Sequence, residues 1–388
     1  MRKANSINMI LTRRITAKRF WRILLLLTIL SACGLANPRS GVQDFDIQRI
    51  DIGHKAASVL ILDEDKGGFP DLVVCGGSSL TIISDDGTGQ YEVQKAIPAG
   101  EQPVDIAAGD FDSDGWADLV VANHDTRYVS LFFGGPGGFS QEKSERFMVN
   151  VSPHPHAVRV ADINEDGYSD FLVDDRDNES LSVFLGLGNG LFDPGEPIMV
   201  GGDPYRGMSL ADINNDGHLD VITPNPLSVA IQVGDGTGTF VAVAGLESAN
   251  MPPFSTAVGD FNGDGIADIA AGSGEGKGQL MIWLGKAFGS FTKTPDATYM
   301  IADGPTKLRT ADINGDNLDD ILVSCYTGNE VAIALGAKMD LKVNLIELDD
   351  NPWDIAVEDL DDNGQMEIVI SSDGGTHINI LWNYEYSN

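Results

Sequence analysis

The feature that most constrains the fold of this chain is a nine-residue acidic pattern that recurs seven times at a nearly constant spacing. The pattern reads Asp, any residue, Asp or Asn, any residue, Asp, Gly, two residues of any kind and Asp, and its fullest copy spans 110–118. The copies begin at residues 63, 110, 162, 212, 260, 312 and 359, so successive copies are 47 to 52 residues apart. A period of this length indicates one supersecondary unit per repeat.

The residues around each copy predict that the unit consists of four short strands. A short alternating run precedes the acidic pattern, as at 104–108, and an apolar run follows it directly, as at 118–122. Third runs come next, at 129–133, 181–185, 229–233, 280–284 and 331–335, and Gly-rich turns lead to more polar fourth runs at 147–151, 299–301 and 343–348. Four strands joined by tight turns, with no room for a helix, are typical of a propeller blade.

The two ends of the sequence predict how the ring closes. After the seventh acidic copy the chain offers two more strands, 367–371 and 378–382, while an unassigned strand stands at 45–52, ahead of the first copy. An N-terminal strand that completes the last blade leaves no exposed sheet edge. We therefore predict an all-β fold: a seven-bladed β-propeller of four-stranded blades over residues 45–388, closed by the N-terminal strand.

The seven acidic loops, together with the Gly-rich turns at 185–192 and 233–240, resemble the FG-GAP/VCBS-type repeats. These are the calcium-binding propeller repeats of integrin α-chains and of many bacterial surface proteins. The resemblance covers residues 45–388 and implies a propeller with calcium in its loops. It says little about biological role, because propellers of this type serve as adhesion modules, scaffolds and occasionally enzyme frames.

The chemistry of the loops also predicts calcium. Ca²⁺ takes six to eight oxygen ligands at about 2.3–2.6 Å, and carboxylates at alternate positions of a tight loop point inward together. An EF-hand is excluded, because the twelfth residue of the second loop is Val121 and that of the third is Val173, where an EF-hand needs Glu. The alternative is that Asp, Asn and Gly merely suit β-turns, and it accounts poorly for seven loops in register.

We expect up to seven Ca²⁺ ions, and the predicted ligands follow the repeat. They are Asp63, Asp65 and Asp71; Asp110, Asp112, Asp114 and Asp118; Asp162, Asn164, Asp166 and Asp170; Asp212, Asn214, Asp216 and Asp220; Asp260, Asn262, Asp264 and Asp268; Asp312, Asn314, Asp316 and Asp320; and Asp359, Asp361, Asn363 and Glu367. The first loop, which has Gly67 at a ligand position, and the seventh are expected to bind most weakly. In the sixth loop Asn317 replaces the glycine, and Asn tolerates the left-handed conformation.

The charge balance excludes one class of partner. The formal net charge is −33, and residues 1–33 hold seven Lys or Arg and no acid, so the rest of the chain carries −40. Such a surface repels phosphate backbones, so nucleic acid is not expected as a partner, and bound cations would supply counter-charge. Cys75 and Cys325 fall in different repeats and are expected to be buried and unpaired.

The first 33 residues have the features of an export signal. A basic segment is followed by the apolar run 23–30, which is too short to span a bilayer, and then by Leu30-Ser31-Ala32-Cys33. This ending resembles a bacterial lipobox, which implies cleavage before Cys33 and a diacylated Cys33, while Gly34 implies sorting to the outer membrane. We assign 1–32 to a lipoprotein signal peptide and 33–44 to a tether; an ordinary secretory peptide or an uncleaved anchor remains the alternative.

The two ends of the propeller differ in composition. Prolines precede six of the seven predicted first strands, and this end is called the proline face; the opposite end is the acidic-loop face. The six prolines are Pro103, Pro155, Pro204, Pro253, Pro305 and Pro352. Just after them come the candidate ligand residues His156, Tyr205, Arg206, Phe254, Lys307 and Trp353. These side chains are expected either to form a ligand site round the channel mouth or to plug it as core.

The function predicted from these features is that of a non-enzymatic, calcium-binding adhesion propeller. It is expected to be monomeric, to reach the membrane through its lipid anchor only, and to display one face to a protein or glycan ligand. No nucleophile elbow or Gly-rich phosphate loop is recognisable, and His154 and His156 have no evident ligand partner. Two alternatives stay open: a polysaccharide-acting enzyme, such as a lyase, with its site in the central funnel, and a structural subunit of an envelope assembly.

Overall fold

A computed structural model describes residues 42–43, 46–85, 89–204, 207–226, 228–248, 251–273, 277–338, 340–382 and 385–386. The predicted signal peptide and Cys33 lie outside these ranges, as do Tyr205 and Arg206. Residues 40–388 form one compact unit. The described ranges contain a single 3₁₀ turn, Gln141–Lys143, and no helix long and apolar enough to cross a membrane.

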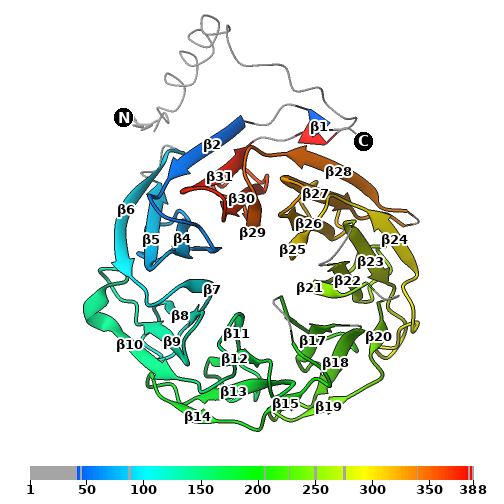
Figure 1. Cartoon of the computed structure of the whole chain (residues 1–388), viewed down its shortest axis with the longest axis horizontal. Helices are drawn as coiled ribbons and strands as arrows, with labels where there is room; N and C mark the ends of the chain where they lie inside the picture. The colour runs from blue at the N-terminus through cyan, green and yellow to red at the C-terminus, as the bar shows by residue number, and fades with distance from the viewer. Residues whose placement is uncertain are drawn as a thin grey trace, which may run out of the picture. The chain divides into compact units, whose positions relative to one another are not determined.

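Seven antiparallel sheets are arranged in a ring as the blades of a propeller, which confirms the predicted fold (Figure 1). Blade 1 contains β3 (Ser58–Leu62), β4 (Asp71–Gly76), β5 (Ser79–Asp85) and β6 (Tyr91–Pro98). Blade 2 contains β7 (Pro103–Gly109), β8 (Asp118–Asn123), β9 (Tyr128–Phe132) and β10 (Ser144–Met148). Blade 3 contains β11 (Val158–Ala161), β12 (Asp170–Asp175), β13 (Ser180–Gly186), β14 (Phe192–Pro194) and β15 (Ile198–Met199).

The remaining blades repeat the same order of strands from the centre of the ring outward. Blade 4 contains β16 (Ser209–Ala211), β17 (Asp220–Asn225), β18 (Ser228–Gly234), β19 (Phe240–Ala242) and β20 (Leu246–Glu247). Blade 5 contains β21 (Pro253–Gly259), β22 (Asp268–Ser273), β23 (Gln279–Trp283) and β24 (Ala297–Met300), and blade 6 contains β25 (Pro305–Ala311), β26 (Asp320–Cys325), β27 (Glu330–Leu335) and β28 (Lys342–Glu347). Blade 7 contains β29 (Pro352–Glu358), β30 (Glu367–Ser372) and β31 (His377–Trp382).

The fourth strands depart most from the boundaries predicted from the sequence. In blade 2 the strand is Ser144–Met148 rather than 147–151. In blade 3 the fourth strand is split into β14 and β15, which both pair with β13, because Pro194 and Pro197 interrupt it and proline cannot donate to the ladder. In blade 4 β19 and β20 share β18 in the same way.

The N-terminal strand closes the ring as predicted. β2 (Asp46–Asp51) pairs antiparallel with β31 over six residue pairs, from Asp46 opposite Trp382 to Asp51 opposite His377, and supplies the fourth strand of blade 7. Ile50 and Ile52 are buried there together with Ile378 and Ile380. Beyond the predicted strands, β1 (Val42–Gln43), which the sequence placed in the tether, pairs with β32 (Glu385–Tyr386).

The hydrophobic core lies mainly between neighbouring blades. One cluster joins blades 2 and 3 through Phe111, Phe171 and Phe192, and the rings of Phe171 and Phe184 stack 4.7 Å apart. Cys75 and Cys325 are buried as free thiols in different clusters, as expected. Because each blade contributes to two such clusters, the blades hold one another in place and position the loops at both ends of the ring.

Candidate functional site

The seven acidic loops all connect the first strand of a blade to its second strand. They therefore lie at the same end of the ring, as the strand directions require. Their first aspartate shapes each loop: Oδ2 of Asp110 accepts the backbone N–H of Gly115 at 3.0 Å, and the corresponding bonds of the other loops are 2.7–3.0 Å long. Gly115 has a φ of 84°, and in the sixth loop Asn317 adopts a φ of 64°, the left-handed conformation expected of it.

The last acid of loops 2 to 6 ties two parts of the blade together. In loop 2, Asp118 is buried, its Oδ2 accepts the N–H of Phe111 at 2.8 Å and its Oδ1 accepts the N–H of Gly134 at 2.8 Å. Asp170, Asp220, Asp268 and Asp320 make the same two kinds of bond. This side chain thus joins the end of the first strand to the end of the third, a structural role that the sequence analysis did not foresee.

The sequence patterns also did not point to the glycine whose backbone N–H bonds to this acid. At Gly134 a Cβ would lie 2.2 Å from the carbonyl oxygen of Ala117, so only glycine fits this position. The glycine follows the acid by 14 to 17 residues in loops 2 to 6, at Gly134, Gly186, Gly234, Gly285 and Gly336. That spacing is visible in the sequence and is the signal that would have identified it.

The electrostatics of the loops favour a bound cation. Burial raises the pKa of Asp118, Asp170 and Asp268 to about 6, and that of Asp320 and Glu367 to about 7. The other acids of each loop add to this rise, and the bonds from backbone amides oppose it. Near neutral pH the folded chain therefore resists full ionisation of these carboxyls, unless a nearby positive charge compensates.

The geometry of the loops also fits calcium. Three loops have an acid at the third position, and in each of them three carboxylate oxygens, one from each of three acids, lie within 4.8 Å of one another. The three groups are Asp63, Asp65 and Asp71; Asp110, Asp112 and Asp118; and Asp359, Asp361 and Glu367. Two oxygens on one Ca²⁺ are at most about 5 Å apart. Oδ1 of Asp110 and Oε1 of Glu367 are buried and accept no hydrogen bond among the described residues. Such oxygens are suited to a metal.

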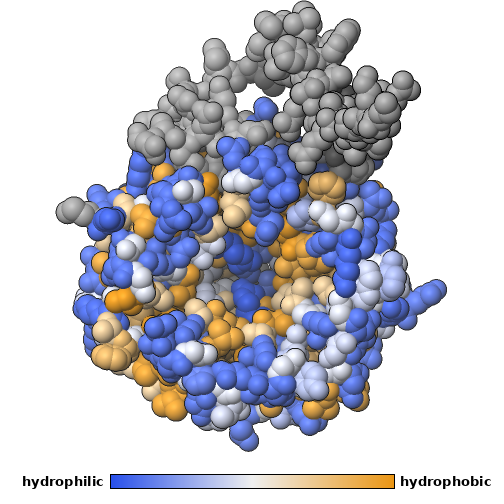
Figure 2. All heavy atoms as spheres, turned by 180° about the vertical axis from the view of Figure 1, so that it is seen from behind, coloured by the Kyte–Doolittle hydropathy of each residue, from blue (hydrophilic) through white to orange (hydrophobic). Residues whose placement is uncertain are grey.

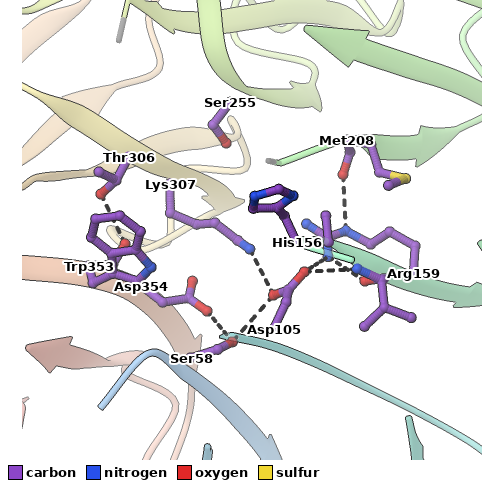
Figure 3. A network of polar contacts seen from close by, with 12 residues as sticks. Ser58, Asp105, His156, Arg159, Met208, Ser255, Thr306, Lys307, Trp353 and Asp354 are labelled. Atoms are coloured by element: carbon purple, nitrogen blue, oxygen red, sulfur yellow. Dashed lines mark hydrogen bonds and ion pairs between the residues drawn. The ribbon is translucent and has the colours of Figure 1, made fainter. Parts of the chain in front are cut away.

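A second group of charged residues lies inside the central channel (Figure 3). Asp105 on β7 accepts from Lys307 Nζ at 3.0 Å, from Arg159 Nη1 at 2.9 Å and from the backbone of Val158 at 3.1 Å. Ser58 Oγ donates to Asp354 at 2.6 Å and contacts Asp105 at 3.4 Å. Burial opposes the charge of Asp105, but the two cations and the hydrogen bonds outweigh it and hold the pKa of this carboxyl well below its usual range.

The channel widens on the acidic-loop side of this charged group. A cavity of about 450 Å³ is lined by the later residues of the first strands of blades 1 to 6, among them Leu60, Val160 and Leu308. Figure 2 shows the opening of the channel at one face, with hydrophobic residues on its wall and hydrophilic residues inside.

The structure brings three of the ligand candidates together on the proline side. His156, Lys307 and Trp353 line one small cavity at the start of the first strands. His156 and Lys307 are buried, and Lys307 is paired with Asp105, whereas Trp353 is half-buried with its ring 5.2 Å from that of Tyr326. Phe254 is half-buried on β21 and does not line this cavity.

Fold and loops together define a β-propeller built from acidic-loop repeats. A model of the FG-GAP-like repeat matches residues 63–121, 110–173, 175–223, 221–271 and 260–323. These matches cover more than half of the chain, which therefore belongs to the FG-GAP-like repeat family.

Comparison with individual proteins gives more distant similarities. The chain is 28% identical over 265 residues to the T-cell immunomodulatory protein homolog of Plasmodium yoelii yoelii; the match covers 55% of this chain but only 37% of that relative. Its fold is similar to that of BBS1N in complex with ARL6DN (TM-score 0.61, 12% identity, 88% of this chain and 96% of that one). Virginiamycin B lyase from Staphylococcus aureus is similar too (TM-score 0.59, 9% identity, 88% and 100%). At these identities the two structures bear on the fold alone.

Proposed function

We propose that this protein is a calcium-stabilised binding propeller, held at the cell envelope through Cys33, that displays its proline face to a protein or glycan ligand. The observation that carries the proposal is the set of seven acidic loops in register, each closed by a buried acid. Calcium in these loops would neutralise carboxylates that the fold otherwise crowds together. The ions would then stabilise the ring, and the opposite face would remain for binding.

We expect the purified protein to hold five to seven Ca²⁺ ions per chain. The predicted ligands of the loops are all carboxylate or amide oxygens, the kind of donor that calcium prefers. The measurement is metal analysis after purification in millimolar calcium and removal of free metal. Two or fewer calcium ions per chain would refute the calcium part of the proposal.

The side chains and the stiff backbone of the proline face suit it to ligand binding. Phe254 and Trp353 are aromatic and half-buried, so neither residue is fully covered by the protein. The prolines that begin these strands fix the backbone, which lowers the entropy lost on binding. On the acidic-loop face, by contrast, the carboxylates would be engaged with metal.

We expect Phe254→Ala and Trp353→Ala to weaken ligand binding at least about tenfold while leaving the protein folded, as truncation of aromatic anchors does at binding sites. The ligand would first be found by screening the protein against glycans and envelope proteins in saturating calcium. Phe288→Ala is the matched control, because Phe288 is 93% exposed and lies in the turn between β23 and β24, on the acidic-loop face. A loss of about 3–5 kcal/mol of stability for both test variants would instead identify the aromatics as core.

The anchor at Cys33 rests on the sequence of residues 1–33 alone. In the native host, wild-type protein is expected to incorporate labelled fatty acid and to fractionate with membranes, and Cys33→Ser is expected to do neither. Wild-type protein that takes up no label would remove the anchor from the proposal and leave the calcium loops unaffected.

A further inference from the structure

Three of the six histidines of the chain meet on the proline side of blades 2 and 3. His124 follows β8 in the turn to β9, while His154 and His156 lie in the segment between β10 and β11. One ring nitrogen from each lies within 4.8 Å of the others. The ring centroids are 3.8 Å apart for His124 and His154, 4.6 Å for His154 and His156, and 5.0 Å for His124 and His156.

Each of the three rings contacts a carboxylate. Nδ1 of His156 lies 3.1 Å from Oδ2 of Asp174, a fully buried residue whose Oδ1 also accepts the backbone N–H groups of His156 and Ala157. Oδ1 of Asp125 lies 3.1 Å from Nδ1 of His124 and 3.4 Å from Nδ1 of His154. A carboxylate bonded to a histidine fixes the orientation of the ring and makes it a better metal ligand.

The contacts of His156 also define its tautomer. Nη1 of Arg176 lies 3.5 Å from Nε2 of His156, and a guanidinium can only donate, so Nε2 carries the lone pair while Nδ1–H faces Asp174. Arg176 is itself held by Asp203 through contacts of 2.7 and 2.9 Å. A metal ion bound to Nε2 of His156 would displace only the long contact to Arg176. The guanidinium of Arg176 would stay paired with Asp203.

We propose that His124, His154 and His156 form a binding site for a transition-metal ion, with Zn²⁺ as the preferred occupant. All three donors are imidazoles, which suit zinc and do not suit calcium. Nitrogens on a tetrahedral zinc ion are about 3.4 Å apart, and the three ring nitrogens lie within 4.8 Å of one another. Prolines 153 and 155 flank His154 and restrict its backbone.

Three protein ligands leave one coordination position open. The side chains of His124, His154 and His156 are 26%, 17% and 7% exposed, so the cluster is reachable from solvent on one side. His156 also borders the cavity shared with Lys307 and Trp353. The metal would therefore lie on the proline face, but the site does not depend on the proposed protein or glycan ligand or on calcium.

The test is a zinc titration of the full chain, purified without a histidine tag, in millimolar calcium so that the acidic loops are filled. Isothermal titration is expected to show one Zn²⁺ per chain, and Co²⁺ is expected to give the visible absorption of a tetrahedral site. His124→Ala and His154→Ala should each weaken zinc binding at least about tenfold. His54→Gln should leave it unchanged, because His54 lies outside the cluster and contacts Thr81.

A further variant tests the role assigned to His156 without removing that buried ring. Arg176→Gln should tighten zinc binding severalfold, because it removes a nearby positive charge and the competing contact to Nε2. Melting curves recorded in calcium will show that the variants are folded. Absence of stoichiometric zinc binding by the wild type, binding that survives both histidine substitutions, or weaker binding by Arg176→Gln would each overturn the proposal.

Discussion

Replacing Asp118 by alanine is expected to lower the free energy of unfolding by about 2–4 kcal/mol even when calcium is absent. The side chain is buried and accepts two backbone N–H groups, from Phe111 and Gly134. Without it both donors are left buried and unpaired, and each such group costs about 1–3 kcal/mol. The relief of an unfavourable buried charge, whose pKa is raised to about 6, offsets part of this loss.

Asp114 provides the matched comparison within the same loop. It is exposed, and its Oδ1 accepts the N–H of Trp116, so Asp114→Ala in EGTA should cost no more than about 0.5 kcal/mol. In calcium the same variant should lose the stabilisation that a bound ion adds, about 2.7 kcal/mol at 100 times Kd. Urea unfolding of both variants, with and without calcium, measures these differences. Equal losses for the two variants in EGTA would contradict the structural role assigned to Asp118.

Removing the carboxylate of Asp105 is expected to cost about 3–5 kcal/mol, because it leaves the buried ammonium of Lys307 without the carboxylate to which it is bonded. Lys307 is 7% exposed and its Nζ lies 3.0 Å from Asp105. Burial lowers the pKa of Lys307, and the charge of Asp105 opposes that change, so the loss of Asp105 should also favour the neutral amine. Thermal and urea unfolding of Asp105→Ala measure the effect.

The pH dependence follows from the depressed pKa of Asp105 in the folded chain. A carboxyl with a lower pKa in the folded than in the unfolded state adds stability above the unfolded value of about 4, and this stability is lost as the pH falls further. The gap between wild type and Asp105→Ala should thus be largest near neutral pH. Lys307→Met leaves Asp105 paired with Arg159 and should cost less. A larger loss for Lys307→Met than for Asp105→Ala would contradict this account.

The sequence allowed the blades, their number and the closure of the ring to be predicted, because these depend on a local pattern that repeats. The acidic loop marks the end of one strand and the start of the next, so seven copies mark seven blades. The fourth strands were less predictable since they lie at the rim of the ring. There, partial exposure weakens the apolar pattern, and Pro194 and Pro197 divide one of them.

The contacts that cross the ring were not predictable from a local pattern. Asp105 meets Arg159, 54 residues away, and Lys307, 202 residues away, and only the closed ring brings these three residues to one point. His124 meets His154 and His156 because the turn between β8 and β9 lies next to the segment that links blades 2 and 3. The loop acids were assigned as ligands from their spacing, whereas the bonds of Asp118 to Phe111 and Gly134 required the folded blade.

The closing strand β2 has a mechanical consequence. β1 pairs with β32 over two residue pairs, so tension applied from the N-terminal side would reach β2 once this short pairing opens. The bonds to β31 lie across the strand direction and extend over six residue pairs, so they would share the load in shear instead of opening one after another. The pairing of β2 with β31, which completes the ring, is thus positioned to bear the force if the protein is pulled through its N-terminal segment.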